Sequence, residues 1–276
     1  LTPYAGWLRE KYGLAFEDYA SLWQWSVDEP ADFWKSILDY FEVKCYMPPE
    51  AIMSDDPMPH TRWFGGATLN YAEHVFRNKT VERPAILFVA ERREAATMSW
   101  EELERQTGAL QTYLKQLGVQ PGDRVAAYIP NIPQATVALL ATVSLGAVWS
   151  SCSADFGPES VLDRFRQIAP KVLIAVDGYH YNGKPYDRME RVKEISSHLP
   201  SLEKVILIPY LTDKPDSGII KNAILWEKGR AWPAGPLTGT PVPFSHPIWV
   251  VYSSGTTGMP KAITHPQGGM LLERLK

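Results

Sequence analysis

The chain has 276 residues, 45% of them hydrophobic and 12% aromatic, which is enough apolar side-chain area for one large or two ordinary domains. Its formal net charge is -3, so it lacks the basic surface typical of proteins that bind nucleic acid or acidic membranes. The two cysteines, Cys45 and Cys152, are far apart and lack the spacing of a metal site, so we expect reduced thiols in a cytoplasmic protein.

The first 60 residues carry apolar side chains at helical spacing. Asp28 and Pro30 favour a helix start for the segment that reaches Phe41. We therefore predict a helical N-terminal extension over residues 1–60, followed by a larger domain over residues 61–276. The apolar positions of the extension are Trp7, Trp23, Trp25, Phe33, Trp34, Ile37, Leu38 and Phe41.

From Pro84 onward the pattern alternates between short apolar runs and helical periodicity. Ser99 and Glu102 form a capping box before one of the helices. Such an alternation predicts an α/β fold with a layered, largely parallel sheet and flanking helices. The predicted strands are 84–90, 124–129, 171–176 and 204–208, and the predicted helices are 100–117, 133–147, 158–168 and 186–198.

The longest apolar stretch, residues 135–149, is too short to span a membrane. Thr142, Ser144 and Gly146 also interrupt it. We interpret it as part of a buried helix and predict no membrane partner.

Near the end of the chain, YSSGTTGMPK (Tyr252 to Lys261) directly follows the apolar run 248–251. A polyphosphate requires dense N–H and O–H donors, glycines that allow the backbone to approach, and a cation. The loop therefore predicts a cradle for nucleotide phosphates, and the alternative is a flexible turn between two strands. The candidate phosphate-binding residues are Ser253, Ser254, Gly255, Thr256, Thr257, Gly258 and Lys261.

This loop is not a Walker A motif. Met259 and Pro260 separate its second glycine from Lys261, and Ala262 stands where the magnesium-binding Ser or Thr would be. The apolar residues 262–264 predict that a short strand, and not a helix, follows the loop. The hydrogen-bond donors for the phosphates must therefore come from the loop itself and not from the N-terminus of a helix. The position after an apolar strand matches the carboxyl edge of a parallel sheet, where ligands bind in open α/β folds.

The string SSGTTGMPK resembles the phosphate-loop signature of the adenylate-forming superfamily. Three further segments are similar to the acetoacetyl-CoA synthetase family, and LWQWSVDEPADFW (22–34) resembles an extension that acetyl-CoA and acetoacetyl-CoA synthetases share. The resemblance covers nearly the whole chain. The three segments are WFGGATLNYAEH (63–74), DFGPESVLDRFRQIAPK (155–171) and YNGKPYDR (181–188).

The resemblance implies an acid-thiol ligase that uses ATP, Mg2+ and CoA. Acetoacetate would attack the α-phosphorus of ATP to give acetoacetyl-AMP and pyrophosphate, and the CoA thiol would then displace AMP. In the family the phosphate loop holds the β- and γ-phosphates, so residues 253–258 would donate hydrogen bonds. Lys261 would be the catalytic residue that neutralises the developing charge. The sequence assigns no metal ligands.

Acetyl-CoA synthetases carry an FGG turn and an Arg-rich segment near CoA. The matching positions of this chain are Ser153 to Asp155 for the turn and Tyr181, Asn182, Gly183 and Lys184 for the segment. The resemblance implies CoA contacts at Tyr181, Asn182, Gly183 and Lys184, although these residue types differ from those of the acetyl-CoA synthetases. The alternative for the second segment is a polar turn before a helix.

The chain starts at Leu1 and stops at Lys276, soon after the phosphate loop. The resemblance therefore implies an N-terminal fragment, inactive alone, whose partner is the missing C-terminal portion with its catalytic lysine. An acetyl- or propionyl-CoA synthetase is the alternative within the class. The alternative from another class is a non-catalytic nucleotide-binding or interaction module.

Overall fold

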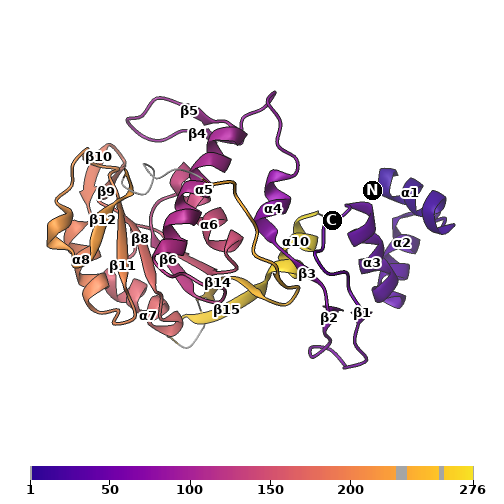
Figure 1. The fold of residues 1–276 in the computed structure, drawn as a ribbon. Helices are drawn as coiled ribbons and strands as arrows, with labels where there is room; N and C mark the ends of the chain where they lie inside the picture. Colours follow the sequence, from indigo (N-terminus) through magenta and orange to yellow (C-terminus); the bar gives the residue numbers. More distant parts are fainter. Residues whose placement is uncertain (1, 228–234, 255–257, 276) are drawn as a thin grey trace. The chain divides into compact units, whose positions relative to one another are not determined.

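The computed structural model describes residues 2–227, 235–254 and 258–275, and the chain forms two compact units (Figure 1). Unit 1 comprises Leu1–Leu69, Pro241–His246 and Pro266–Lys276. Unit 2 comprises Asn70–Thr240 and Pro247–His265. Each unit is thus assembled from stretches that are far apart in sequence.

Unit 1 begins with three helices, as its apolar spacing predicts. They are α1 (Thr2–Tyr12), α2 (Tyr19–Asp28) and α3 (Pro30–Tyr40). Asp18 caps α2 by accepting a hydrogen bond from the Ser21 N–H at 2.8 Å, and Pro30 occupies the first turn of α3. The predicted helix start at Pro30 is therefore confirmed.

The rest of unit 1 consists of short strands and one helix. Strand β1 (Ala51–Met53) pairs antiparallel with β2 (Trp63–Gly65), and β3 (Thr68–Leu69) pairs antiparallel with β13 (Val242–Pro243). Helix α10 (Gln267–Leu275) packs on α3. A Cβ at Gly268 would lie 2.2 Å from the ring of Phe244, so only glycine lets this helix start so close to the ring.

Unit 2 is built on a seven-stranded sheet in the order β12-β11-β8-β6-β7-β14-β15, and each adjacent pair from β12 to β14 is parallel. This confirms the predicted fold class. The predicted strands 124–129, 171–176 and 204–208 correspond to β6, β8 and β11. The seven strands are β6 (Arg124–Tyr128), β7 (Val148–Cys152), β8 (Val172–Val176), β11 (Lys204–Ile208), β12 (Ala223–Leu225), β14 (Pro247–Ser253) and β15 (Lys261–Pro266).

Helices pack on both faces of this sheet (Figure 1). Within the sheet, the chain moves in one direction from β6 to β7 and in the opposite direction from β7 past β6 to β8. Because crossovers between parallel strands are right-handed, the helices of these two connections lie on opposite faces of the sheet. Helices α5 and α6 pack together, and so do α7 and α8. The helices of unit 2 whose bounds lie within the described residues are α4 (Tyr71–Phe76), α5 (Trp100–Gln116), α6 (Pro133–Ser144), α7 (Pro158–Ile168) and α8 (Met189–Ser197), with a short 3-10 helix at Ser217–Ile219.

Strand β8 forms the centre of the core, because all five of its residues are fully buried. Its Leu173 and Ala175 belong to the same apolar cluster as Phe165 of α7 and Ile195 of α8. A strand buried on both faces is expected to be apolar throughout, as this one is. The predicted buried helix is also confirmed, since seven of the 12 residues of α6 are buried.

Unit 2 also contains two antiparallel hairpins. They are β4 (Ile86–Phe88) with β5 (Ala96–Met98), and β9 (Gly178–Tyr181) with β10 (Lys184–Asp187). The predicted helix start at Tyr186 is wrong, because β10 continues to Asp187 and α8 begins at Met189. Asn182 and Gly183 form the two-residue turn, with φ angles of 50° and 73°. Asn-Gly is the strongest short-range signal for such a hairpin and could have been used.

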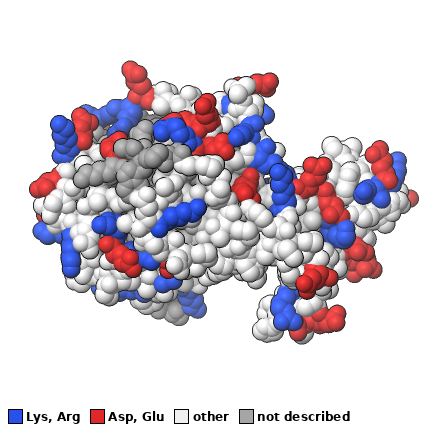
Figure 2. Space-filling model, viewed as in Figure 1, with Lys and Arg blue, Asp and Glu red and all other residues white. Residues whose placement is uncertain are grey.

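Acidic and basic side chains are interspersed on the face of the molecule shown in Figure 2. Within the described ranges, no helix combines the length and the apolar character needed to cross a bilayer.

Candidate functional site

Strand β14 carries the predicted phosphate loop at the carboxyl edge of the sheet. Its Trp249 pairs in parallel register with Trp149 of β7, and the Ser150 hydroxyl donates to the Val250 carbonyl oxygen at 2.8 Å. Ser253 is the last residue of β14 and is half-buried, whereas Ser254 is exposed. Both hydroxyl side chains thus lie where the loop begins.

The other predicted phosphate ligands differ in how far the structure describes them. Gly255, Thr256 and Thr257 lie outside the described residues. Gly258 has a φ of 101°, which favours glycine, and Lys261 is exposed at the first position of β15. Strand β15 lies beside β14 at the sheet edge, so the predicted return strand is confirmed and runs two residues further, to Pro266.

Side chains from neighbouring elements hold both ends of this loop. Before it, the Tyr252 hydroxyl donates to the Arg164 carbonyl oxygen at 2.9 Å. After it, Nε2 of Gln167 donates to the Pro260 carbonyl oxygen at 2.9 Å. Both contacts come from α7, so one helix positions the entry and the exit of the loop.

A hollow of about 420 Å³ lies beside the start of the loop and between the ends of β7 and β14. The Arg164 guanidinium faces it and lies 5.0 Å from the ring centroid of Phe156 and 5.8 Å from that of Tyr252. Burial raises the pKa of Tyr252 above its ordinary value. Arg164 was not a sequence candidate, and nothing in the residues around it distinguishes it from other exposed-face arginines.

The turn after β7, which matches the FGG position, is held by two buried side chains. The Tyr128 hydroxyl shares its single hydrogen between the carbonyl oxygens of Ala154 at 2.8 Å and Phe156 at 2.7 Å. Nε of Arg188 donates to the same Ala154 oxygen at 2.7 Å. Ser153 and Asp155 are exposed on either side of the buried Ala154, so this turn presents two polar side chains to solvent.

The second predicted segment is brought together at the tip of the β9–β10 hairpin. Tyr181 and Lys184 are the paired residues that flank the turn, and Asn182 and Gly183 form it. Tyr181 is 65% exposed. The described residues show no hydrogen bond or ion pair that joins this hairpin to the phosphate loop, so the structure presents them as two separate parts of a candidate site.

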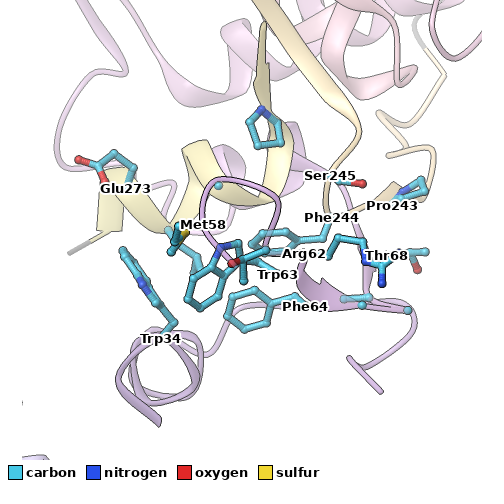
Figure 3. Close-up of a pocket in the computed structure, with 17 residues that line it drawn as sticks. Trp34, Met58, Arg62, Trp63, Phe64, Thr68, Pro243, Phe244, Ser245 and Glu273 are labelled. Atoms are coloured by element: carbon cyan, nitrogen blue, oxygen red, sulfur yellow. The ribbon is translucent and has the colours of Figure 1, made fainter. Parts of the chain in front are cut away.

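Unit 1 contains a larger, mostly apolar cavity of about 800 Å³. Figure 3 shows the rings of Trp34, Trp63, Phe64 and Phe244 around it, and the Phe64 and Phe244 centroids lie 4.5 Å apart. Residues 63–68 of the WFGGATLN segment line this cavity, which the sequence analysis did not predict.

The same segment continues into unit 2, where its Asn70 has a structural role. Asn70 caps α4, and its Nδ2 donates to the carbonyl oxygens of Val143, Ser144 and Thr240 at 2.9–3.2 Å. Asn70 is 1% exposed, so these bonds satisfy a buried amide. The role of Asn70 in this structure is therefore to join three segments of unit 2.

Nearly the whole chain is similar to known protein families. Residues 73–275 match the family model for AMP-binding enzymes, and residues 19–75 match the model for the acetyl-coenzyme A synthetase N-terminus. The chain belongs to the AMP-binding enzyme family, whose members use ATP.

Individual relatives are more specific, and they are acetoacetyl-CoA synthetases, as the sequence resemblance indicates. The chain is 39% identical to that of Rhizobium meliloti (strain 1021) over 278 residues, which cover 100% of this chain and 42% of the relative. It is also 39% identical to that of Rattus norvegicus over 273 residues, 96% of this chain and 41% of the relative.

A solved structure supports the same relationship. The acetoacetyl-CoA synthetase from Streptomyces lividans superposes with a TM-score of 0.93 and 50% sequence identity over 100% of this chain and 42% of that one. The chain therefore spans about 42% of the length of the relatives it matches.

Proposed function

We propose that the chain is part of an ATP-dependent ligase that joins acetoacetate to CoA through acetoacetyl-AMP. The observation that carries the proposal is the loop after β14, which places Ser253 and Ser254 at the carboxyl edge of the sheet and Lys261 across the loop from them. Identities of 39% and 50% to acetoacetyl-CoA synthetases over the whole chain support the choice of acid.

The phosphate loop would bind the β- and γ-phosphates of ATP in this proposal. Hydroxyl and backbone donors of residues 253–258 would form charge-assisted hydrogen bonds, and Lys261 would offset the charge that develops as pyrophosphate leaves. Mg2+ would arrive with the triphosphate, since this ion is commonly held by substrate phosphates and few protein groups. Among the described residues no three His, Cys, Asp or Glu side chains form a cluster suited to a metal.

CoA would contact the hairpin tip formed by Tyr181, Asn182, Gly183 and Lys184, and the turn at residues 153–155. Lys184 is the cation of this group and suits a phosphate of CoA. The hollow beside Arg164 lies next to both the turn and the phosphate loop. Its aromatic walls and single guanidinium suit the passage of an uncharged pantetheine arm that ends close to the adenylate.

Acetoacetate, ATP and CoA are thus the proposed substrates of a protein of the relatives' length, and the cytoplasm is its proposed location. The remaining partner would be the portion of such an enzyme that the relatives carry beyond the matched region. We propose that the 276-residue chain alone does not catalyse the reaction, because the relatives are more than twice as long.

Substrate competition tests the proposal in a protein of the relatives' length that carries these residues. Acetoacetate should exceed acetate, propionate and butyrate in kcat/KM, because a site that bonds the 3-keto oxygen leaves buried polar groups unpaired with the other acids. Acid-dependent pyrophosphate release measures the first step, and thioester formation measures the second. Equal use of acetate would exclude acetoacetate as the preferred acid.

An acetyl- or propionyl-CoA synthetase is the second candidate, and the match of residues 19–75 to the acetyl-coenzyme A synthetase N-terminus is the observation that favours it. The competition assay separates the two. A non-catalytic nucleotide-binding module would release no pyrophosphate with any acid.

A further inference from the structure

A carboxylate of this chain occupies the hairpin turn at which CoA is proposed to bind. Oε1 of Glu91 accepts a hydrogen bond from the Asn182 N–H at 2.9 Å, and Oε2 accepts one from the Gly183 N–H at 2.8 Å. Two successive amides thus converge on the two oxygens of one anion. Consecutive N–H groups in a turn form a concave donor pair that suits carboxylates and phosphates alike.

Basic groups surround this donor pair. Nη2 of Arg92 donates to the Gly183 carbonyl oxygen at 2.8 Å, and Lys184 is exposed one residue further along. The bonds from Gly183 and Asn182 lower the pKa of Glu91, and the charges of His180 and Arg92 add to this effect. The turn is therefore an environment that stabilises negative charge.

The contact crosses between two hairpins that are 91 residues apart in sequence. The β4–β5 loop provides Glu91, Arg92 and Arg93, and the Arg93 guanidinium lies 4.1 Å from the ring centroid of Tyr210. Arg93 also donates to the Tyr210 carbonyl oxygen. Arg92 bonds the hairpin at the Gly183 carbonyl oxygen and Arg93 anchors the loop at Tyr210, so neither contact depends on the Glu91 carboxylate.

Glu91 also lies where a dissolved anion could compete with it. Its side chain is exposed, so a ligand reaches the two amides without unfolding the hairpin. A terminal phosphate presents the same pair of adjacent oxygens as a carboxylate and carries more charge opposite Arg92 and Lys184.

We propose that the Asn182–Gly183 turn is a phosphate-binding site and that Glu91 occupies it as an internal competitor, which sets the affinity for the phosphate group of an incoming ligand. With respect to CoA, this inference rests on the proposed function. With respect to phosphate itself, it rests only on the hairpin.

Titration with inorganic phosphate tests the competitor directly. The amide resonances of Asn182 and Gly183 are followed by NMR in the 276-residue chain, in Glu91→Gln and in Glu94→Gln. Glu94 is an exposed carboxylate of the same loop and forms no hydrogen bond or ion pair with the residues that the structure describes, so its substitution makes the same charge change without touching the turn. We expect Glu91→Gln to bind phosphate about two- to fivefold more tightly than the other two proteins, the scale of one exposed ionic contact. Equal affinity in all three proteins, or no binding in any, would overturn the proposal.

A structural role alone for Glu91 gives a different result. In that case Glu91→Gln loosens the hairpin, weakens phosphate binding and disturbs the stacking of Tyr179 on Tyr186, whose centroids lie 5.5 Å apart. Ring contacts between these tyrosines, measured in the same spectra, show whether the hairpin is intact. Weaker phosphate binding with loosened tyrosine contacts would also overturn the proposal.

CoA and 3′-dephospho-CoA, titrated in the same way, separate this inference from the proposed function. Tighter CoA binding by Glu91→Gln, with little change for the dephosphorylated form, supports both. If Glu91→Gln binds phosphate more tightly and neither CoA form binds, the phosphate site is supported and the CoA assignment is wrong. If CoA binds equally to all three proteins and their phosphate affinities are also equal, the CoA assignment is supported and the competitor role of Glu91 is wrong.

Discussion

The buried guanidinium of Arg188 donates from Nε to the carbonyl oxygen of Ala154 at a distance of 2.7 Å. Arg188 is 6% exposed, and it also donates to the Asp187 carbonyl oxygen and the Tyr179 hydroxyl. It therefore connects the start of α8 and the β9–β10 hairpin to the turn after β7. One side chain links both segments that we propose to face CoA.

Replacement of Arg188 should be costly for stability. Arg188→Met removes three hydrogen bonds from a buried position, and we expect the free energy of unfolding to fall by about 2–3 kcal/mol. Tyr128→Phe removes only the hydroxyl, and since Arg188 still bonds Ala154, a loss of about 1 kcal/mol is expected. Urea denaturation measures both, with the exposed Arg166→Met as the control. A stability of Arg188→Met equal to that of the control would contradict this account.

Lys261 should act in the chemistry and not in the fold. In a protein of the relatives' length, Lys261→Ala should slow adenylate formation by about 10²-fold, the scale of one lost charge-stabilising group. Pyrophosphate exchange measures this step. Lys214→Ala, which changes an exposed lysine elsewhere in unit 2, serves as the control. Exchange at the control rate would remove Lys261 from the mechanism.

The 276-residue chain alone should bind ATP weakly and form no acyl-adenylate. A few charge-assisted bonds, each worth about 1.5–3 kcal/mol, must first offset the cost of ordering a glycine-containing loop. We therefore expect a Kd no tighter than about 1 mM. Calorimetry with ATP and magnesium, beside an acetoacetate-dependent pyrophosphate assay, measures both quantities. Micromolar binding or turnover would show that the chain contains more of the site than we infer.

Cys152 should resist alkylation while the chain is folded. Burial raises the pKa of its thiol to about 12, whereas the half-buried Cys45 has a smaller upward shift in its pKa. At pH 8 iodoacetamide should modify Cys45 roughly tenfold faster than Cys152, because the thiolate is the nucleophile. Mass spectrometry identifies the modified residue. Both thiols should react alike in urea, and rapid labelling of native Cys152 would contradict its burial.

The same shift predicts a pH dependence of stability. Burial raises the pKa of the folded thiol from 9.0 to about 12, so the unfolded chain loses its proton first as pH rises. The stability that the neutral Cys152 contributes is therefore fully present below about pH 9 and is lost between there and about pH 12. Cys152→Ser measures it, because a hydroxyl does not ionise in this range. The stability of wild type relative to this variant should fall with pH, and a constant difference would contradict the prediction.

Local signals in the sequence were sufficient for the parallel sheet and for the position of the predicted phosphate loop within it. The apolar runs of β6, β8 and β11 are continuous because both faces of those strands are buried, and Pro133 and Pro158 mark helix starts because proline suits the first turn. The string from Ser253 to Lys261 indicated the family through its resemblance to the phosphate-loop signature of adenylate-forming enzymes. Each of these features depends on residues that are close together in the sequence.

Tertiary structure alone decided which distant residues share a site. Local spacing does not predict the bond of Glu91 to the Asn182–Gly183 turn or the bond of Arg188 to Ala154. Each bond joins elements that are brought together only by the order of the strands in the sheet and the packing of the hairpins. The misplaced start of α8 has a different origin, because Asn182 and Gly183 are a local hairpin signal that the helix prediction did not use. Residues 184–187 pair with residues 178–181 as a strand, so α8 begins only at Met189. Hydrogen bonds across a hairpin satisfy backbone groups that a local pattern cannot assign to a partner.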